Sequence, residues 1–387
     1  MSVRLKVALA VIVLFIFAGA AVLWTTQGLY RTAIDRAAST SVATAANAFA
    51  SLEAQDIEKL AAANDVLRSR SDLRDAFAAR DRDLLYELSL PIFEELRENY
   101  AITHLYFELP EPESTVFLRT HNLDKRDDVN KRDTYALAVE TKSYGVGKDL
   151  GVTAFALRVV HPWYDDAGEL LGYVETGQEI EEFLDLMAAQ SGDQLTLLLQ
   201  KDKLDAEAWA TMRENRGDAN NWDEYTTYVD AHSTAQAPDA AVVNGLDVAG
   251  LADEGTVLTD VASGDALVVG AFPVNNTKGE PVGVVIVEHD ISELQGQLAA
   301  ARTQTMIIMS GVGVVLVLVV VLMLNALVFK RLTAMINHME DASIRLAGGD
   351  FDIAMPATDS DDEIGQFEKF FGSFIEAVSS TIKQLTK

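Results

Sequence analysis

Two long apolar segments constrain this chain more than any other feature of its sequence. Residues 7–24 (VALAVIVLFIFAGAAVLW) and 306–329 (MIIMSGVGVVLVLVVVLMLNALVF) carry no charged side chain. Each matches the length of about 20 apolar residues that crosses a bilayer as a helix. We therefore expect a membrane protein with two transmembrane helices. A cleaved signal peptide is the alternative for 7–24, but this run is longer than a usual signal core and lacks a clean small-x-small cleavage site.

The flanking cations predict how the chain is oriented. Arg4 and Lys6 precede the first apolar segment, and Lys330 and Arg331 follow the second. The positive-inside rule then places residues 1–6 and the C-terminal region in the cytoplasm, and the chain between the segments outside. We expect a multi-pass protein of the inner (cytoplasmic) membrane, with a large periplasmic domain and a cytoplasmic C-terminus.

Composition and missing motifs exclude several classes of function. The 387 residues carry a net charge of −28, which disfavours nucleic-acid binding, and no cysteine, which excludes disulfides and thiolate chemistry. The sequence has no Gly-x-Ser-x-Gly elbow, no His-Glu-x-x-His motif and no phosphate-binding glycine loop. The six histidines show no metal-ligand spacing. We therefore predict no enzyme, no catalytic residue, no metal and no cofactor.

Between the apolar segments the hydrophobic period changes from helical to alternating. Residues 25–69 are alanine-rich, lack proline and repeat apolar side chains every three or four positions, so they predict a long helix. Residues 81–100 predict a second helix, which Pro91 kinks or restarts. The alternating stretches that follow predict strands, with a short helix after the loop that begins at residue 122 and another helix over 179–190. These strands are 102–109, 114–121, 152–164 and 170–179.

The plan then repeats in reduced form. Four more strands and a final helix over 291–304 are expected, while residues 201–256 resist assignment. These strands are 193–200, 256–261, 265–274 and 281–290.

One stretch of sequence occurs twice. HPWYDDAGELLGYVETGQEI begins at His161, and AFPVNNTKGEPVGVVIVEHDI begins at Ala271. Without gaps, Pro162 aligns with Pro273 and Gly172 with Gly283. Each copy has the form strand, glycine-containing turn, strand, helix start, so we interpret it as the closing hairpin of an antiparallel sheet domain. Chance similarity between hairpins is the alternative.

This layout resembles a double Cache sensor, found on chemoreceptors, histidine kinases and cyclases. The likeness covers residues 30–190 and is carried by Leu118-Arg119, His121, Asp127-Asp128, the helix at 138–141 and the hairpin from Pro162 to Gly177. The resemblance implies an α+β membrane protein with two tandem PAS-like antiparallel sheets on a long helix. The long helix and membrane-distal Cache domain would occupy 26–190, and the membrane-proximal Cache domain 191–304. The proximal strands carry fewer polar residues, which suits a transmitter.

The tail, residues 330–383, is similar to a HAMP domain. Ile336, Met339 and Leu346 form one apolar stripe, and Phe367, Phe371, Phe374 and Val378 form another. The family's usual proline is missing near the first helix start, where Met335 stands. Two such helices from each of two chains can bury their stripes in a parallel four-helix bundle, so the resemblance implies a homodimer. A single amphipathic helix on the lipid surface is the alternative, disfavoured by the acidic residues around 359–363. The signal-transmitting positions would be Gly349, Asp350, Asp362, Glu363 and Gly365.

Strand alternation predicts a ligand site in the first sheet domain. Arg119 and His121 share one face with Phe117, Tyr106 shares a face with His104 and Glu108, and Tyr173 shares a face with Glu175. In the strand before the hairpin, Phe155 points opposite to Arg158. The resemblance implies that Arg132 and Tyr135 cover the sheet. Arginine with tyrosine and histidine suits a small anion such as a carboxylate. The predicted ligand-binding set is Tyr106, Arg119, His121, Arg132, Tyr135, Phe155, Tyr173 and Glu175.

These features together predict a transmembrane receptor. A small extracytoplasmic ligand would bind the distal domain, and the tail would pass the signal to a separate cytoplasmic protein. One alternative is a membrane-tethered binding or scaffold protein that transmits nothing. Others are an anchored periplasmic enzyme and a truncated chemoreceptor or sensor kinase, since the sequence ends at Lys387 just after the tail.

Overall fold

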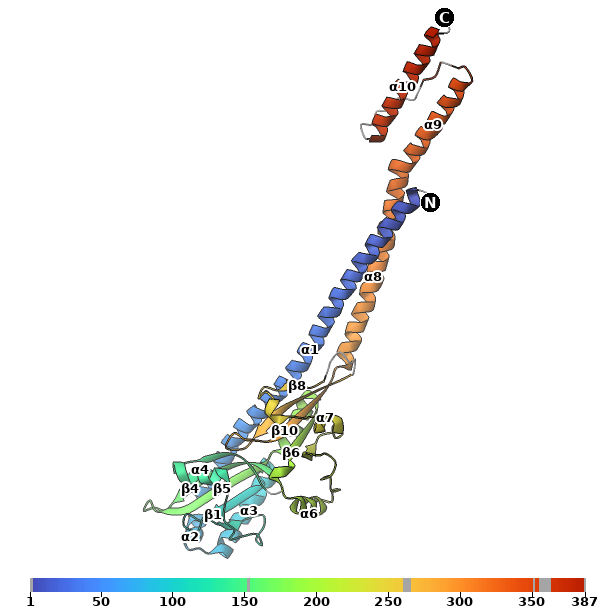
Figure 1. The fold of residues 1–387 in the computed structure, drawn as a ribbon. Helices are drawn as coiled ribbons and strands as arrows, with labels where there is room; N and C mark the ends of the chain where they lie inside the picture. Colours follow the sequence, from blue (N-terminus) through green and yellow to red (C-terminus); the bar gives the residue numbers. More distant parts are fainter. Residues whose placement is uncertain (1–2, 152–153, 260–265, 351, 355–362, 386–387) are drawn as a thin grey trace. The chain divides into compact units, whose positions relative to one another are not determined.

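The computed structural model describes residues 3–151, 154–259, 266–350, 352–354 and 363–385. The chain forms two compact units: Arg31–Gly296 is one, and Met1–Tyr30 with Gln297–Lys387 is the other. Figure 1 shows the elements of both.

Three helices open the Arg31–Gly296 unit. α1 (Val3–Arg68) confirms the long helix, and α3 (Arg82–Tyr100) confirms the second, with Pro91 inside it. Asp81 caps α3 by accepting a hydrogen bond from the Leu84 amide. Between them lies a short helix that the sequence analysis did not separate, α2 (Ser71–Ala78). Its buried face, Leu73, Ala76 and Phe77, follows the same three-to-four period as α1, so only the break at residues 69–70 divides the two.

The first sheet is antiparallel and has the order β2-β1-β5-β4-β3. Four of its strands confirm predicted ones: β1 (His104–Glu108), β2 (Val116–Arg119), β4 (Phe155–Tyr164) and β5 (Leu170–Glu179). The edge strand β3 (Gly145–Leu150) was not predicted, because its two glycines and its charges hide the alternation. α4 (Asp133–Thr141) precedes β3, and α5 (Glu181–Ser191) follows β5.

The second sheet repeats this topology with the order β7-β6-β10-β9-β8. Its strands are β6 (Gln194–Gln200), β7 (Tyr228–Ser233), β8 (Thr256–Val257), β9 (Leu267–Asn275) and β10 (Pro281–Asp290). The unassigned stretch holds β7, α6 (Ala206–Arg216), α7 (Ala240–Asn244) and two short 3₁₀ turns, Lys201–Lys203 and Val248–Gly250. Each repeated sequence stretch is the closing hairpin of its sheet, as predicted.

One hydrophobic core runs along α1 and joins both sheets. Leu157 of β4 and Leu197 of β6 belong to the same buried cluster as Leu60 of α1. Within it the ring of Phe49 from α1 packs edge-on against Phe183 at 5.5 Å and Phe272 at 5.7 Å. Burial of this shared apolar surface favours one body of two sheets over two independent domains.

The repeated glycines have a structural cause. A Cβ added at Gly172 would lie 2.3 Å from the carbonyl oxygen of Glu108, and one at Gly283 would lie 2.4 Å from the carbonyl oxygen of Leu198. Glu108 and Leu198 occupy equivalent places on β1 and β6. The neighbouring strand backbone therefore leaves no room for a side chain at either site.

The second unit contains both apolar segments. Two helices in the described residues are long and apolar enough to cross a membrane, one in the N-terminal part of α1 and the other in α8 (Ser292–Leu324). The Phe15 ring packs so closely on Gly313 that an added Cβ would lie 2.1 Å from it. Small residues allow such close helix packing in membranes. A π-helical turn, Asn325–Phe329, ends the second segment.

The tail holds two parallel amphipathic helices, α9 (Lys330–Ala347) and α10 (Glu363–Leu385). Arg331 pairs with Glu368 near the start of both helices, and Lys383 pairs with Asp352 near their other end.

Ala342, Ile353 and Ile375 form the small core of the tail, and Leu346 and Phe371 pack against it. By contrast, Ile336, Phe367 and Phe374 are largely exposed.

The predicted transmitting residues can be placed in part. Gly349 has a positive φ of 86° at the end of α9, a conformation that favours glycine, and the Asp350 carboxylate pairs with Arg345 at 2.7 Å. Gly365 is buried in α10. Asp362 and the side chain of Glu363 lie outside the described residues, as does Phe351.

We expect Gly172→Ala and Gly283→Ala each to lower the free energy of unfolding by about 1–3 kcal/mol, because the added methyl group forces two strands apart. Urea unfolding of the detergent-solubilised chain, followed by tryptophan fluorescence, measures this change. Gly296→Ala is the control, because Gly296 lies in a helix with no atom within 4 Å of an added Cβ. Equal stability of all three variants would contradict the close-approach explanation.

Candidate functional site

A cleft of about 800 Å³ opens on the face of the first sheet that turns away from α1. Its walls come from three parts of the Arg31–Gly296 unit: the face of β1, β2 and β4, the loop that leads into α4, and the side of the second sheet around α6. The lining includes His104, Tyr106, Arg119, His121, Asp128, Asn130, Arg132, Asp149, Arg158, Lys203, Arg216 and Asn276.

Three guanidinium groups converge on the ring of Tyr106. The central carbons of Arg132, Arg119 and Arg158 lie 5.0, 5.2 and 5.7 Å from the ring centroid, within the range of cation–π attraction. The strand register brings them together, because Tyr106 on β1 pairs with Arg119 on β2 and with Glu175 on β5. The floor of the cleft is therefore an aromatic ring surrounded by cations.

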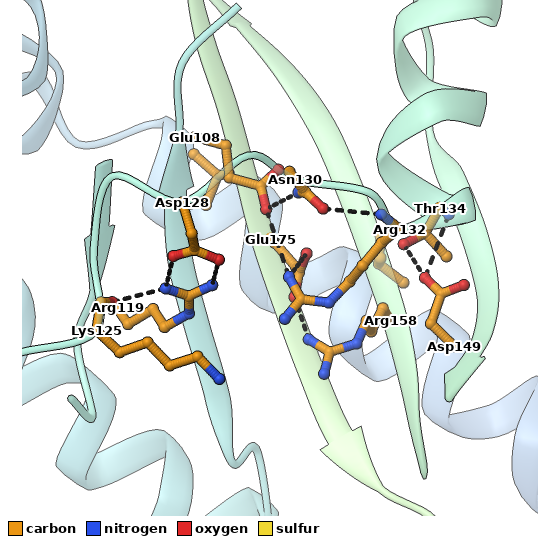
Figure 2. A network of polar contacts seen from close by, with 12 residues as sticks. Glu108, Arg119, Lys125, Asp128, Asn130, Arg132, Thr134, Asp149, Arg158 and Glu175 are labelled. Carbon is orange, nitrogen blue, oxygen red and sulfur yellow. Dashed lines mark hydrogen bonds and ion pairs between the residues drawn. The ribbon is translucent and has the colours of Figure 1, made fainter. Parts of the chain in front are cut away.

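Two fully buried glutamates lie beneath these arginines (Figure 2). The Glu175 carboxylate accepts a hydrogen bond from Arg158 and forms a second ion pair with Arg132 at 3.4 Å. Arg132 reaches Glu108 only at 3.9 Å. Asn130 donates its side-chain amide to Glu108 at 2.6 Å.

The two glutamates titrate in opposite directions. Burial, reinforced by the charge of Glu175, raises the pKa of Glu108 well above its ordinary value. Burial also works against ionisation of Glu175, but Arg132 and Arg158 outweigh it and hold the pKa of Glu175 below its ordinary value. Two guanidinium groups therefore share the Glu175 carboxylate.

Burial and the positive charge of the cleft also act on the histidines. Burial, followed by the charge of Arg158, lowers the pKa of His104 well below its ordinary value. Burial and then Arg119 lower the pKa of His121 to about 4. The rings of the two histidines lie 5.4 Å apart. At neutral pH both are uncharged, and the positive charge of the site comes from arginine.

Arg119 is already engaged by the protein. It forms a bidentate pair with Asp128, at 2.5 and 2.8 Å, and donates to the carbonyl of Lys125 at 2.6 Å. These hydrogen bonds from Arg119 lower the pKa of Asp128. The contacts fold the loop over β2, as Figure 2 shows, so Arg119 orders the wall of the cleft. Of the three arginines around Tyr106, Arg132 is the most exposed, with 22% of its side chain accessible against 4% for Arg119 and 3% for Arg158.

The structure brings together five of the eight predicted ligand residues: Tyr106, Arg119, His121, Arg132 and Glu175. Tyr135 and Tyr173 lie beside this group as an edge-on pair 5.1 Å apart in a small apolar cluster. The Tyr135 hydroxyl donates to the carbonyl of Leu109 at 2.8 Å.

Two placements correct the sequence analysis. Phe155 lies in the core beside α1, because alternation along β4 turns it to the face opposite Arg158. Phe117 does not share the face of Arg119, because a bulge between Phe107 and Glu108 shifts the register and places Phe117 in the core beneath α2. Strand patterns alone do not reveal a bulge.

Three polar residues of the cleft or of the network beneath it share a strand with predicted ligand residues but are absent from the predicted set: Arg158, Glu108 and His104. Strand alternation places all three on the face of the cleft. Arg158 faces opposite to Phe155, and Glu108 and His104 share a face with Tyr106. Arg158 is the most informative omission, because its side chain is 3% exposed and pairs with Glu175.

The second sheet shows that the fold does not require this network. At the gap-free repeat offset, Tyr173 and Glu175 correspond to Val284 and Ile286. Glu108, the register partner of Tyr173, corresponds to Leu198. Across the hairpin, Arg158 corresponds to Val269. These four residues of the second sheet lie in or against a hydrophobic core. The first sheet therefore carries a buried charged cluster where the same topology accepts an apolar core.

Comparison with known proteins agrees with this architecture. A family model described as the double sensory domain of two-component sensor kinases (dCache_3) matches residues 36–295, more than half of the chain. This chain belongs to the double Cache sensor family. The match confirms the resemblance stated for the sheet domains. No curated protein sequence matches the chain.

Solved structures of sensor domains match the chain at low identity and with low TM-scores. The periplasmic domain of Vibrio cholerae LuxQ is 12% identical, with a TM-score of 0.39, and the alignment covers 65% of this chain and 99% of LuxQ. The ligand-binding domain of Campylobacter jejuni chemoreceptor Tlp3 in complex with L-valine is 12% identical, with a TM-score of 0.39 over 69% and 96%. The E. coli DcuS sensor domain is 19% identical, with a TM-score of 0.28 over 33% and 90%. Likeness at this level says nothing about the ligand of this Cache protein.

We expect Glu175→Gln to destabilise the protein by about 3 kcal/mol or more, because it leaves the buried Arg158 guanidinium without a carboxylate. Asp166→Asn is the matched control, since it breaks a pair with Arg74 in which the Asp166 side chain is 84% exposed. This control should cost about 1 kcal/mol or less. Urea unfolding compares the two variants, and equal losses would contradict the buried-pair assignment.

Glu108 should make stability fall with rising pH. Its pKa is raised in the folded state, so folding favours the protonated carboxyl group. The contribution of Glu108 to the free energy of unfolding is therefore fully present below about pH 4.5, its ordinary pKa. This contribution is lost as the pH rises through the pKa of Glu108 in the folded state. Glu108→Gln mimics the protonated acid and lacks this loss.

The difference in melting temperature between the Glu108→Gln variant and the unmodified protein should therefore grow in favour of the variant as pH rises from 5 to 9. The groups facing Glu108 are Glu175, Arg132 and Asn130, and both proteins retain them. A difference that does not change with pH would show that Glu108 does not hold the proton.

Proposed function

We propose that this Cache protein is a transmembrane receptor whose first sheet binds a small anion. The observation that carries the proposal is the partly exposed Arg132 guanidinium above Tyr106, whose carboxylate contacts are both long. Arg132 is held loosely, at 3.4 Å from Glu175 and 3.9 Å from Glu108. A ligand carboxylate can offer this guanidinium a bidentate pair, which is stronger than either of these long contacts.

The charge balance favours a ligand with one negative charge. Arg119 pairs with Asp128 and Arg158 pairs with Glu175, so Arg132 is the arginine around Tyr106 with the weakest carboxylate contacts. The Tyr106 ring and the neutral imidazoles of His104 and His121 offer apolar faces for the rest of the molecule. A small monocarboxylate fits this combination of charge and ring surfaces.

The rest of the chain suits a receptor of the inner membrane. The two apolar helices flank the sensory unit in sequence and would cross the membrane at 7–24 and 306–329. Residues 26–304 would then lie in the periplasm and the tail in the cytoplasm.

α9 and α10 are parallel and amphipathic, and the exposed Phe367 and Phe374 would be buried in a homodimer. We propose that the tail is a HAMP domain that forms a parallel four-helix bundle and acts on a cytoplasmic signalling partner. Gly349, Asp350 and Gly365 would shape its connector, together with Asp362 and Glu363.

The ligand would act by shifting a population. It changes the balance between two packings of the receptor only by as much as its affinities for them differ. Movement of Arg132 from Glu175 to a ligand anion would supply such a difference, because it alters a buried ion pair.

Thermal unfolding of the full chain in nanodiscs tests the anion site. Monocarboxylates, dicarboxylates, amino acids, amines and inorganic anions are screened for a raised melting temperature, which ligand linkage produces in proportion to occupancy. We expect a monocarboxylate to stabilise the protein and Arg132→Gln to weaken its binding about tenfold or more.

Arg126→Gln is the control for that variant, because Arg126 lies on the same loop but outside the cleft lining. It should bind the monocarboxylate normally. Stabilisation by amines alone, or equal binding by both arginine variants, would contradict the proposed ligand class.

A further inference from the structure

The turn between β9 and β10 is docked onto the first sheet. The Thr277 amide donates to the carbonyl of Lys148 on β3 at 2.8 Å, and its hydroxyl lies 3.0 Å from the same oxygen. The hydroxyl also lies 3.2 Å from a carboxylate oxygen of Asp149. A Cβ at Gly147 would lie 2.5 Å from the Thr277 hydroxyl oxygen, so the contact is close.

The other carboxylate oxygen of Asp149 holds the start of α4. It accepts hydrogen bonds from the Thr134 amide at 3.2 Å and the Thr134 hydroxyl at 2.5 Å. Asp149 and Thr134 are both buried, and Figure 2 shows this contact beside the arginine cluster. One carboxylate therefore links the first turn of α4 to the β9–β10 turn.

The first turn of α4 also belongs to the ligand cleft. Arg132 is the residue directly before the helix, and its backbone amide is held by Asn130 at 3.0 Å. Asp133 is the next residue, and it pairs with Lys278 at 2.6 Å. Any shift of Arg132 towards a ligand acts on the turn of helix that Asp149 holds.

We propose that Thr134, Asp149 and Thr277 form a junction that passes a change at Arg132 to the β9–β10 hairpin, and so to α8. This inference rests on the proposed function, because Arg132 is its input. The output follows from the chain itself, since β10 ends at Asp290 and α8 begins at Ser292 with the second apolar segment.

The contacts of the junction differ in how strongly they hold the β9–β10 turn on the first sheet. The Lys278 side chain is 63% exposed, and a solvated ion pair of this kind contributes little. Thr277 and Asp149 are more buried, and their hydrogen bonds have fixed directions. The apolar core along α1 also joins the sheets, but it has no polar link to Arg132. Thr277 is therefore the residue whose loss should uncouple the hairpin from the cleft.

Hydrogen exchange of the full chain in nanodiscs, with no ligand added, tests the junction through a double-mutant cycle. We expect Arg132→Gln to speed amide exchange in the β9–β10 turn, residues 275–280, by about two- to tenfold. In a Thr277→Val background the same substitution should no longer change exchange there. It should still change exchange in the first turn of α4. Thr277→Ser keeps the hydroxyl and should restore the effect.

Two controls separate this route from others. Arg126→Gln removes a charge from the same loop outside the cleft and should leave the turn unchanged. Arg216→Gln breaks the ion pairs of α6 with Glu179 and Glu181, both at 3.3 Å, and should leave the effect of Arg132→Gln intact. If the effect persists in Thr277→Val but disappears in Arg216→Gln, coupling runs through α6 and the junction is overturned.

Because the cycle needs no ligand, its result is independent of the anion screen. Coupling without anion binding would retain the junction and reject the ligand class. Anion binding without coupling would retain the receptor site and reject the junction.

Discussion

The ionised Glu175 carboxylate, buried between two guanidinium groups, is the interaction on which the sensory half of this protein depends. An unpaired charge in this position would cost several kcal/mol, and the buried Arg158 supplies the close partner that prevents this cost. Arg158 is fixed by its strand, whereas Arg132 comes from the loop before α4 and adds a longer contact at 3.4 Å. Glu175 therefore ties the loop and the start of α4 to the sheet through a contact that can be exchanged, while Arg158 stays in place.

The two sheets share one topology but differ in the residues on their outer faces. Both have the same strand order and the same glycine against a neighbouring carbonyl, and both pack on the core along α1. On the outer face, however, one carries charge and the other Val284, Ile286 and Leu198. An apolar face is the less costly solution, since buried polar groups require partners. The first sheet retains the costly one, and the proposed ligand site rests on this difference.

A few contacts connect the cleft to the helix that contains the second apolar segment. Arg132 adjoins the first turn of α4, Asp149 connects that turn to Thr277, and the hairpin of Thr277 continues into α8. The shared core makes the two sheets one body, while these directional hydrogen bonds connect one specific point of the cleft to one specific turn.

The sequence by itself determined the elements with strong local signals. The apolar segments, the alanine-rich helix and most strands follow from hydrophobic period, and the repeated hairpin already indicated two sheets of one kind. Alternation also placed Tyr106, Arg119 and Glu175 on one surface. Only the tertiary structure decided the rest. The bulge near Phe107 moved Phe117 into the core, and the edge strand β3 emerged only through pairing with β4. Likewise, the partners of Arg119, Arg132 and Arg158 depend on strand register and on a loop that lies far from β5 in sequence. Ion pairing is a property of distances between side chains, and a linear pattern carries no such distances.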